Sequence, residues 1–385
     1  MHTHDVAIVG LGTAGAAAAA LCAQRGLTVI GFDRGPLDQA GARWVNGVTG
    51  WCFDKSGISR STGDELRGTG DHRFHLIAGW TGKRVVIEGR DVLDVDMRML
   101  VDRLQSLAWD AGAEFHGDCS VRGWDGEVLA TDGGDFRPHW VVDASGIKGA
   151  GLVSLEPIPS SDMCTAAHQI RQVTDVDAAL AWCAENGAAE GENLCFTGVA
   201  GGYSIVNVHL HGEEVSILTG SMANEKSGTA LLEEFVASQA WIGGKVFGGA
   251  RAIPVGMPRR QLGHGKVALI GDSAGQVYAS HGSGIGVQLV AARLLADTLA
   301  AGRDPASYSR RWWRRYGASL VVSARFARFS RSLSTDQIET LIASGLMSES
   351  MCRATMEQRS PHLTDLPPVL GGAMRLAFSA SPRMR

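Results

Sequence analysis

Short apolar runs and glycines alternate along the first part of the chain. Residues 6–9 are apolar without alternation, as in a parallel strand that is buried on both faces. An alanine-rich stretch predicts a helix over residues 16–24, and a second apolar run over 27–33 predicts another strand. A strand, a helix and a strand in this order predict a parallel βαβ unit.

The turn between the first predicted strand and the helix is rich in glycine. Gly10, Gly12 and Gly15 have the spacing G-x-G-x-x-G. In such a turn the first glycine makes the bend, the second lets a pyrophosphate approach the backbone, and the third lets the helix pack against the strand. Asp33 ends the second predicted strand, where a carboxylate can accept a hydrogen bond from a ribose hydroxyl. The pattern predicts a dinucleotide site, and the alternative is a close helix–strand contact without a ligand.

The hydrophobic spacing becomes that of an amphipathic helix near residue 96. Leu100, Leu104 and Leu107 share one face of this predicted helix, and Arg98 lies in its first turn, off that face. A positive charge at a helix start is unfavourable unless an anion is near. Arg98 is therefore either an anion ligand or a solvated surface side chain. Residues 121–146 then predict an antiparallel meander whose last strand returns to the parallel sheet.

A second glycine-rich loop lies far from the first. An apolar run ends at Asp272, glycines recur up to residue 284, and a helical pattern begins at Ile285. Ser283 occupies a position from which it could cap this helix. Between the meander and this loop, the segments 201–210 and 213–221 predict two strands flanked by helical stretches.

Composition narrows the class of protein. The chain has 385 residues, of which 45% are hydrophobic and 20% charged, as in globular proteins with two or more domains. Its net charge of −4 argues against a nucleic-acid partner. The seven cysteines include no C-x-x-C pair, which favours reduced thiols and disfavours a disulfide framework or a metal site. Because the sequence has no signal-peptide pattern and no apolar run that could span a membrane, we expect a cytoplasmic protein.

Two segments are rich in aromatic residues. Residues 302–331 hold eight arginines against one acid, Asp304, with interleaved aromatic residues. A helix of this kind at 310–331 can contact an anionic partner such as a carrier protein or lipid headgroups, or it can pack its aromatic side chains inward. The aromatic residues between Trp44 and Trp80 predict half-buried loops, which either line an apolar cleft or hold the loops to the surface.

The order of the motifs resembles that of a known superfamily. G-x-G-x-x-G, the helix with Arg98, the strand ending in D-A-S-G and the loop G-D-x-A-G…G-x-G-I are similar to the para-hydroxybenzoate hydroxylase superfamily of FAD enzymes. Within it, geranylgeranyl reductases and flavin-dependent halogenases have the most similar pattern. The resemblance implies an α/β fold with a Rossmann-like FAD-binding domain (1–70, 96–160 and 250–305), an interleaved antiparallel-sheet substrate domain (71–95 and 161–249) and a C-terminal helical segment (306–385).

The resemblance also implies a cofactor and the residues that hold it. FAD would lie across the sheet, with its pyrophosphate at the first glycine turn and its flavin half at the second. Asp272 would bond a ribityl hydroxyl, and NAD(P)H or another transient reductant would supply electrons. The implied cofactor-binding residues are Gly10, Gly12, Ala14, Gly15, Asp33, Arg34, Arg43, Arg98, Ala144, Ser145, Gly146, Gly271, Asp272, Gly282, Gly284 and Ile285.

Two residues are candidates for catalysis. His281 lies in the second loop, near the position where family members usually carry a proline beside the flavin. It is either a proton donor or substrate contact, or it satisfies the backbone of the turn. Cys52 stands roughly where geranylgeranyl reductases carry a cysteine that is followed by glycines, although no glycine run follows it here.

These features predict an FAD-dependent oxidoreductase. We favour a monooxygenase that acts on a bulky, partly apolar and carrier-bound or free small-molecule substrate, because the segments typical of the reductases are degraded. The alternatives are a reductase or dehydrogenase of carbon–carbon bonds, a halogenase-like flavoenzyme and a non-catalytic flavoprotein. The chemistry of such enzymes is mostly that of the cofactor.

Overall fold

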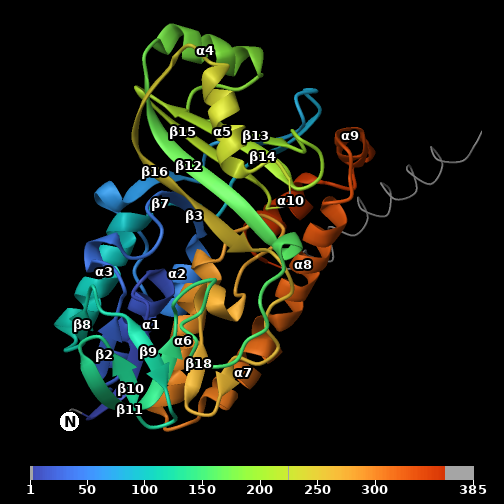
Figure 1. Ribbon diagram of the computed structural model, residues 1–385. Helices are drawn as coiled ribbons and strands as arrows, with labels where there is room; N and C mark the ends of the chain where they lie inside the picture. Colours follow the sequence, from blue (N-terminus) through green and yellow to red (C-terminus); the bar gives the residue numbers. More distant parts are fainter. Residues whose placement is uncertain (1–2, 224, 360–385) are drawn as a thin grey trace, which may run out of the picture. The chain divides into compact units, whose positions relative to one another are not determined.

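The computed structural model describes residues 3–223 and 225–359, which form two compact units (Figure 1). Unit 1 comprises the described residues up to Gly68, together with Leu93–Asp162 and Ile253–Arg325. Unit 2 comprises Thr69–Val92, Met163–Ala252 and the described residues from Phe326 onward. The roles assigned to the predicted domains stay predictions, and residues 360–385 of the predicted C-terminal segment lie outside the described residues.

Unit 1 is built on an eight-stranded sheet that is mostly parallel. Its main path runs in the order β17 (Gly263–His264), β18 (Val267–Leu269), β11 (Gly134–Asp143), β1 (Thr3–Val9), β2 (Val29–Phe32) and β8 (Glu114–His116). The pairs from β18 to β8 are parallel, and β17 is antiparallel at the edge. Residues 6–8 have no exposed surface, as expected for a parallel strand that is covered on both faces. The predicted βαβ unit is confirmed.

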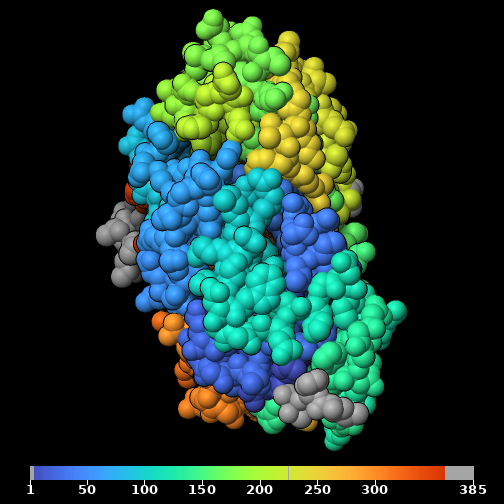
Figure 2. Space-filling view, turned by 90° about the vertical axis from the view of Figure 1, so that its left-hand side faces the viewer, coloured from blue at the N-terminus to red at the C-terminus, as the bar shows by residue number. Residues whose placement is uncertain are grey.

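Helix α1 (Thr13–Ala23) is buried along its whole length. It packs against α3 (Met97–Asp110) and α6 (Ile285–Ala300). Alanine has the smallest side chain that retains a high helix propensity, so the run of alanines lets these helices approach closely. Helix α3 lies at the surface of unit 1 (Figure 2), and it buries Leu100 and Leu104 as its pattern predicts.

The other strands of unit 1 lie in a meander and in a small separate sheet. Strand β10 (Leu129–Thr131) pairs antiparallel with β11 on one side and with β9 (Val121–Trp124) on the other, and the three strands make the predicted meander. A three-stranded sheet contains β3 (Val45–Thr49), β7 (Val92–Asp96) and β4 (Leu66–Thr69). Short 3-10 turns lie at Leu37–Gln39, Gly63–Glu65, Ser160–Asp162 and Gly271–Ala274.

The prediction of aromatic loops between Trp44 and Trp80 is wrong in its local structure. This segment contains β3, helix α2 (Gly50–Ser56), β4 and β5 (Phe74–Ala78). Phe53 has no exposed surface and Phe74 is 7% exposed, whereas Trp80 is 56% exposed. The helix and the strands here are short and rich in glycine, so the sequence shows no clear period.

Unit 2 is a seven-stranded sheet with helices on both faces. Its order is β16 (Ile242–Pro254), β12 (Met163–Val173), β15 (Glu214–Met222), β14 (Ser204–His211), β13 (Asn193–Thr197), β5 and β6 (Arg84–Ile87). The pairs from β12 to β13 are antiparallel, which confirms the two strands predicted within 201–221. Helices α4 (Val176–Glu185) and α5 (Gly228–Ala237) contribute Cys183 and Phe235 to a core with Phe196 and Ile217.

The described part of the C-terminal segment is helical. It contains α7 (Pro305–Trp312), the π-helical turn η5 (Trp313–Gly317), α8 (Ala318–Ser330), α9 (Thr335–Ser344) and α10 (Glu349–Met356). Within the described part of the chain, no helix combines the length and apolar character that crossing a membrane requires. Together the two units confirm the predicted α/β class with an additional antiparallel sheet.

Candidate functional site

The first glycine turn leaves the carboxyl end of β1 and is packed too tightly for side chains. Gly10 has φ +93°, and a Cβ atom there would lie 2.6 Å from the carbonyl oxygen of Ala144. A Cβ atom on Gly15 would lie 1.8 Å from the carbonyl oxygen of Gly10. Both positions require glycine because the backbone itself fills the space. The contact with Ala144 also brings this turn together with the predicted D-A-S-G segment.

Asp143 holds the D-A-S-G segment at the end of β11. Its carboxylate is buried and accepts hydrogen bonds from the backbone N–H of Ser145 at 3.1 Å and from the Ser145 hydroxyl at 2.6 Å. A third bond comes from the N–H of Ala150 at 3.3 Å. Gly146 follows with φ +85°. The Ser145 hydroxyl therefore stabilises the turn, and its predicted contact with the cofactor stays a prediction.

The second glycine loop meets the same place from the end of β18. Gly271 has φ +78°, and a Cβ atom there would lie 3.0 Å from the Cβ of Ala14 in α1. Gln276 has no exposed surface. Its side-chain oxygen accepts from the N–H of Gly271 at 2.9 Å, and its amide nitrogen donates to the Tyr308 hydroxyl at 2.7 Å. The structure thus brings residues 10–15, 144–146 and 271–272 together, as the motifs predict.

Gln288 holds the predicted ribityl ligand Asp272. Its side-chain amide donates to the Asp272 carboxylate at 2.9 Å from the first turn of α6. Sequence reasoning missed both Gln288 and Gln276. The only signal available was a polar residue at a buried position of a helix and of a glycine loop, since buried polar side chains almost always have specific hydrogen-bond partners.

The two helices that start at the glycine turns have uncapped N-termini. Gly12 is the N-cap of α1 and Gly284 is the N-cap of α6, and neither helix has a side-chain cap or an acidic residue in its first turn. The first N–H groups of a helix have no partner within the helix, and they favour an anion. Ile285 begins α6 as predicted, but the suggestion that Ser283 caps this helix is wrong. Its hydroxyl lies 3.4 Å from the carbonyl oxygen of Gly47.

Asp33 and its neighbours surround the first turn. The Asp33 carboxylate accepts from the N–H of Leu11 at 2.8 Å and from the N–H of Gly35 at 3.1 Å, so it fixes the turn that precedes α1. Arg34 and Arg43 are exposed, and the Arg43 guanidinium donates to the backbone carbonyl of Asp38. Their predicted contacts with the cofactor stay predictions.

Arg98 has a carboxylate partner within the protein. Its guanidinium donates to both oxygens of Asp96, at 3.0 and 2.5 Å, and Asp96 is also the N-cap of α3. Burial raises the pKa of Asp96, but the hydrogen bond and the charge of Arg98 outweigh it, so this pKa lies below its ordinary value. Asp96 is therefore an anion that compensates the charge of Arg98 at the helix start, and a contact with the cofactor stays a prediction.

The two candidate catalytic residues lie in different surroundings. The His281 ring stacks on the Tyr278 ring, with centroids 5.6 Å apart. The backbone N–H of His281 donates to the backbone carbonyl of Tyr278 at 3.2 Å. Cys52 has no exposed surface. The Thr49 hydroxyl donates to its sulfur at 3.0 Å, and a Cβ atom on Gly286 of α6 would lie 2.8 Å from that sulfur. Cys52 thus fills the contact between α2 and α6, and a catalytic role for either residue stays a prediction.

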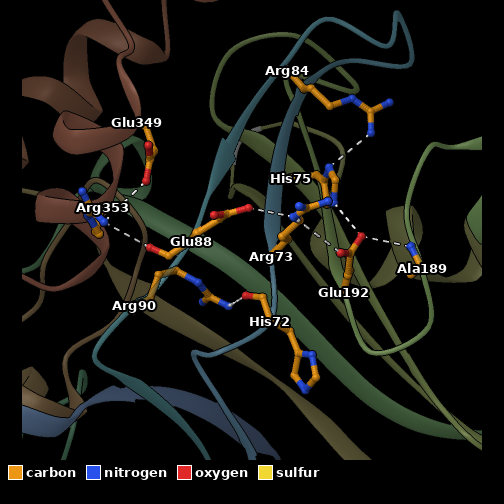
Figure 3. Close-up of polar contacts among 10 residues, drawn as sticks. All are labelled: His72, Arg73, His75, Arg84, Glu88, Arg90, Ala189, Glu192, Glu349 and Arg353. Atoms are coloured by element: carbon orange, nitrogen blue, oxygen red, sulfur yellow. Dashed lines mark hydrogen bonds and ion pairs between the residues drawn. The ribbon is translucent and has the colours of Figure 1, made fainter.

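Unit 2 has a polar cluster of its own that the sequence did not indicate (Figure 3). The His75 ring lies between the Glu192 carboxylate, 3.0 Å from Nε2, and the Arg84 guanidinium, 3.3 Å from Nδ1. Arg73 pairs with Glu88 at 2.7 Å. Burial raises the pKa of Glu192, but hydrogen bonds from the backbone N–H of Ala189 and from His75 outweigh it, so this pKa lies below its ordinary value. Because these charges satisfy one another, the cluster stabilises the edge of the sheet. Among the described residues, no group of His, Cys, Asp and Glu could hold a metal ion.

Comparisons with known proteins agree with this geometry. No family model matches the chain. The chain is 25% identical over 387 residues to a digeranylgeranylglycerophospholipid reductase of Methanopyrus kandleri, a match that covers 91% of this chain and 92% of that protein. Its fold is similar to that of a geranylgeranyl bacteriochlorophyll reductase-like protein of Thermoplasma acidophilum, with a TM-score of 0.76, 17% identity and 98% of both chains covered.

A myxobacterial chondrochloren halogenase, a variant of the FAD-dependent halogenases, is also similar. Its TM-score is 0.65 at 14% identity, with 100% of this chain and 92% of that chain covered. The fold of the chain is therefore similar to the folds of these two proteins. The chain is similar in sequence to a digeranylgeranylglycerophospholipid reductase and in fold to reductase-like and halogenase structures, which confirms the resemblance of its motifs.

Proposed function

We propose that the chain binds FAD where its two glycine turns meet and that it reduces carbon–carbon double bonds in an isoprenoid lipid. One observation supports the cofactor above all others: segments from three distant parts of the sequence converge on two uncapped helix N-termini. The reaction type is supported by the sequence similarity to a digeranylgeranylglycerophospholipid reductase, because this similarity covers 91% of the chain.

Several residues of this chain would hold the cofactor. The N–H groups at Gly12 and the start of α1 would receive the pyrophosphate, and Asp33 would accept from a ribose hydroxyl. Asp272, oriented by Gln288, would accept from the ribityl chain. The N-terminus of α6 would stabilise negative charge at the flavin edge. Bound FAD supplies hydride transfer, and NAD(P)H or another transient reductant would supply the electrons.

Monooxygenation is the second candidate. It is favoured by the burial of Cys52, which has no exposed surface, and by the absence of the glycine run that follows the cysteine in geranylgeranyl reductases. Geranylgeranyl reductases also carry an aromatic Y-x-W-x-F-P segment, of which residues 201–208 of this chain keep only Tyr203. Burial raises the pKa of the Tyr203 phenol well above its ordinary value. A monooxygenase would need the same cofactor cradle and would differ in how it uses oxygen.

The cofactor proposal is tested by flavin content. The purified protein should be yellow and release FAD on denaturation. Gly12→Ala should reduce FAD affinity, because its Cβ atom enters the turn and lies only 3.0 Å from the Cα of Gly41. Gly123→Ala is the matched control, since its Cβ atom would meet nothing within 4 Å. A protein that cannot be reconstituted with FAD would contradict the proposal, as would equal FAD affinity in both variants.

The reaction type is tested by the mass of the product. Protein reduced without oxygen and mixed with a geranylgeranyl lipid should yield products that gain two hydrogens per double bond. The same protein in air should yield no product that has gained an oxygen atom. Oxygenated product, formed only in air, would instead support the monooxygenase.

A further inference from the structure

One side of helix α8 (Ala318–Ser330) is apolar and exposed. Val322, Phe326 and Phe329 are 66%, 42% and 51% exposed. These positions are four and three residues apart, so at 3.6 residues per turn they lie within a sector of about 60°. We call these three residues the α8 stripe. Large apolar side chains that gather on one exposed helix face are typical of an interaction surface.

The opposite side of α8 is firmly packed. Leu320 and Ala327 have no exposed surface, and Ala324 is 4% exposed. The Ser323 hydroxyl accepts a hydrogen bond from the N–H of Ser280 at 2.9 Å. The helix is therefore held by its other face, and the α8 stripe is not the face that the fold uses for its own packing.

The surroundings of the stripe are positively charged. Arg325 and Arg328 are exposed on α8, and Arg314 and Arg315 are exposed on the preceding turn η5. The sequence contains no acidic residue between Asp304 and Asp336. Exposed arginines beside an apolar stripe, without acids on the same segment, complement a surface that is negatively charged outside and apolar beneath.

We propose that the α8 stripe docks on the surface of an anionic lipid bilayer. The side chains of Val322, Phe326 and Phe329 enter the boundary between headgroups and acyl chains, while Arg325 and Arg328 contact headgroup phosphates. An acidic carrier protein would use the arginines and would leave the three apolar side chains without a role. An anionic bilayer accounts for both the apolar stripe and the arginines beside it. The proposal does not depend on which reaction the protein catalyses.

Vesicle flotation of the full-length protein tests the proposal. The protein should float with vesicles of phosphatidylcholine and phosphatidylserine, should not float with phosphatidylcholine alone, and should be released by salt. Phe326→Ser with Phe329→Ser should weaken binding about tenfold or more, because less apolar area enters the bilayer. Arg325→Glu with Arg328→Glu should weaken it as strongly.

Matched controls separate the stripe from general effects. Trp109→Ser with Met257→Ser removes exposed apolar side chains elsewhere, which are 44% and 49% exposed. Lys245→Glu with Lys266→Glu changes the net charge by the same amount as the arginine pair, at exposed positions away from α8. Neither control pair should alter binding.

A labelled variant gives a second, direct readout. Seven native cysteines are buried, so Val322→Cys offers an accessible thiol for an environment-sensitive fluorophore. Its emission should shift to the blue on anionic vesicles, and the same label at Met257→Cys should not shift. Equal binding to neutral vesicles, unchanged binding of the phenylalanine variant or an unshifted label would each overturn the proposal. If the arginine variant loses vesicle binding and the phenylalanine variant does not, the surface recognises negative charge alone, as an acidic protein partner would present it. If the protein forms concentration-dependent dimers and does not bind vesicles, the stripe contacts a second copy of the chain.

Discussion

Replacing Arg98 separates a structural role from a cofactor contact. In the structure its guanidinium donates to Asp96 at 3.0 and 2.5 Å, and the Asp96 side chain is 2% exposed. Arg98→Met removes the charge and both hydrogen bonds but keeps a side chain of similar reach. The buried carboxylate then loses the arginine that compensates its desolvation.

The exposure of the pair sets the size of the expected effect. Breaking a fully buried ion pair on one side costs roughly 3–5 kcal/mol. The Arg98 side chain is 34% exposed, so water screens part of its interaction with Asp96. We therefore expect Arg98→Met to lower the free energy of unfolding by about 1–3 kcal/mol at neutral pH.

The effect should depend on pH in a defined direction. The pKa of Asp96 lies below its ordinary value in the folded protein. Such a carboxyl group stabilises the fold at pH values above its unfolded pKa, and this contribution is lost as the pH falls through the folded pKa. In Arg98→Met, burial raises the pKa of Asp96 instead. The difference between the two proteins should thus be largest near neutral pH and should shrink below about pH 4.

Urea unfolding of the FAD-free protein, followed by circular dichroism at neutral and acidic pH, measures both effects. Arg60→Met is the matched control, because Arg60 contacts Asp54 with the same two-bond geometry, at 3.0 and 2.7 Å, but the side chains are 43% and 57% exposed. This control should change stability very little. If Arg98→Met is as stable as the control at every pH and loses FAD affinity, the structural reading is refuted and Arg98 is a cofactor ligand.

Three further variants test the second loop and its support. Gln276→Leu removes the hydrogen-bond partner of the Tyr308 hydroxyl, so we expect the free energy of unfolding, measured in urea, to fall by about 1–3 kcal/mol. An unchanged free energy of unfolding would contradict the stabilising role of this hydrogen bond. His281→Ala removes the ring that stacks on Tyr278, and we expect a stability loss of about 1 kcal/mol with FAD content unchanged; a fall in kcat of about 10²-fold at unchanged stability would instead identify a catalytic histidine. Cys52→Ala should lower stability by about 1–2 kcal/mol through a small cavity and spare turnover, whereas full stability with loss of turnover would identify a catalytic thiol.

The sequence predicts those parts of unit 1 that depend on local rules. Gly10 has a positive φ that favours glycine, and a side chain on Gly15 would overlap the backbone of the turn, so the spacing of these glycines follows from local geometry. The uninterrupted apolar residues 6–9, followed at once by a glycine turn, favour a strand that is buried on both faces. The strand–loop–helix order around Ile285 follows the same logic, so the meeting of distant motifs could be anticipated.

The parts that could not be predicted depend on contacts between distant residues. The sequence around Gln276 does not indicate that its side-chain amide donates a hydrogen bond to the Tyr308 hydroxyl. Asp96, the partner of Arg98, is only two residues away. The unfavourable position of a positive charge at a helix start predicts a nearby anion, but it does not tell whether that anion is a side chain or a ligand. Ser283 is a favourable capping residue by type, yet α6 begins after Gly284, because the chain there follows the packing of Gln276 and Gln288.

The complete burial of α1 has a consequence for biosynthesis. The helix has no solvent face, and part of its cover comes from α6, which begins at Ile285. On the ribosome, the first glycine turn and its alanine helix emerge long before that cover is made. A helix of about eleven residues is marginal on its own in water, and this one is apolar on every side. The nascent chain therefore cannot complete the turn until α6 has also been synthesised, so the turn and its helix reach their final surroundings long after they leave the ribosome.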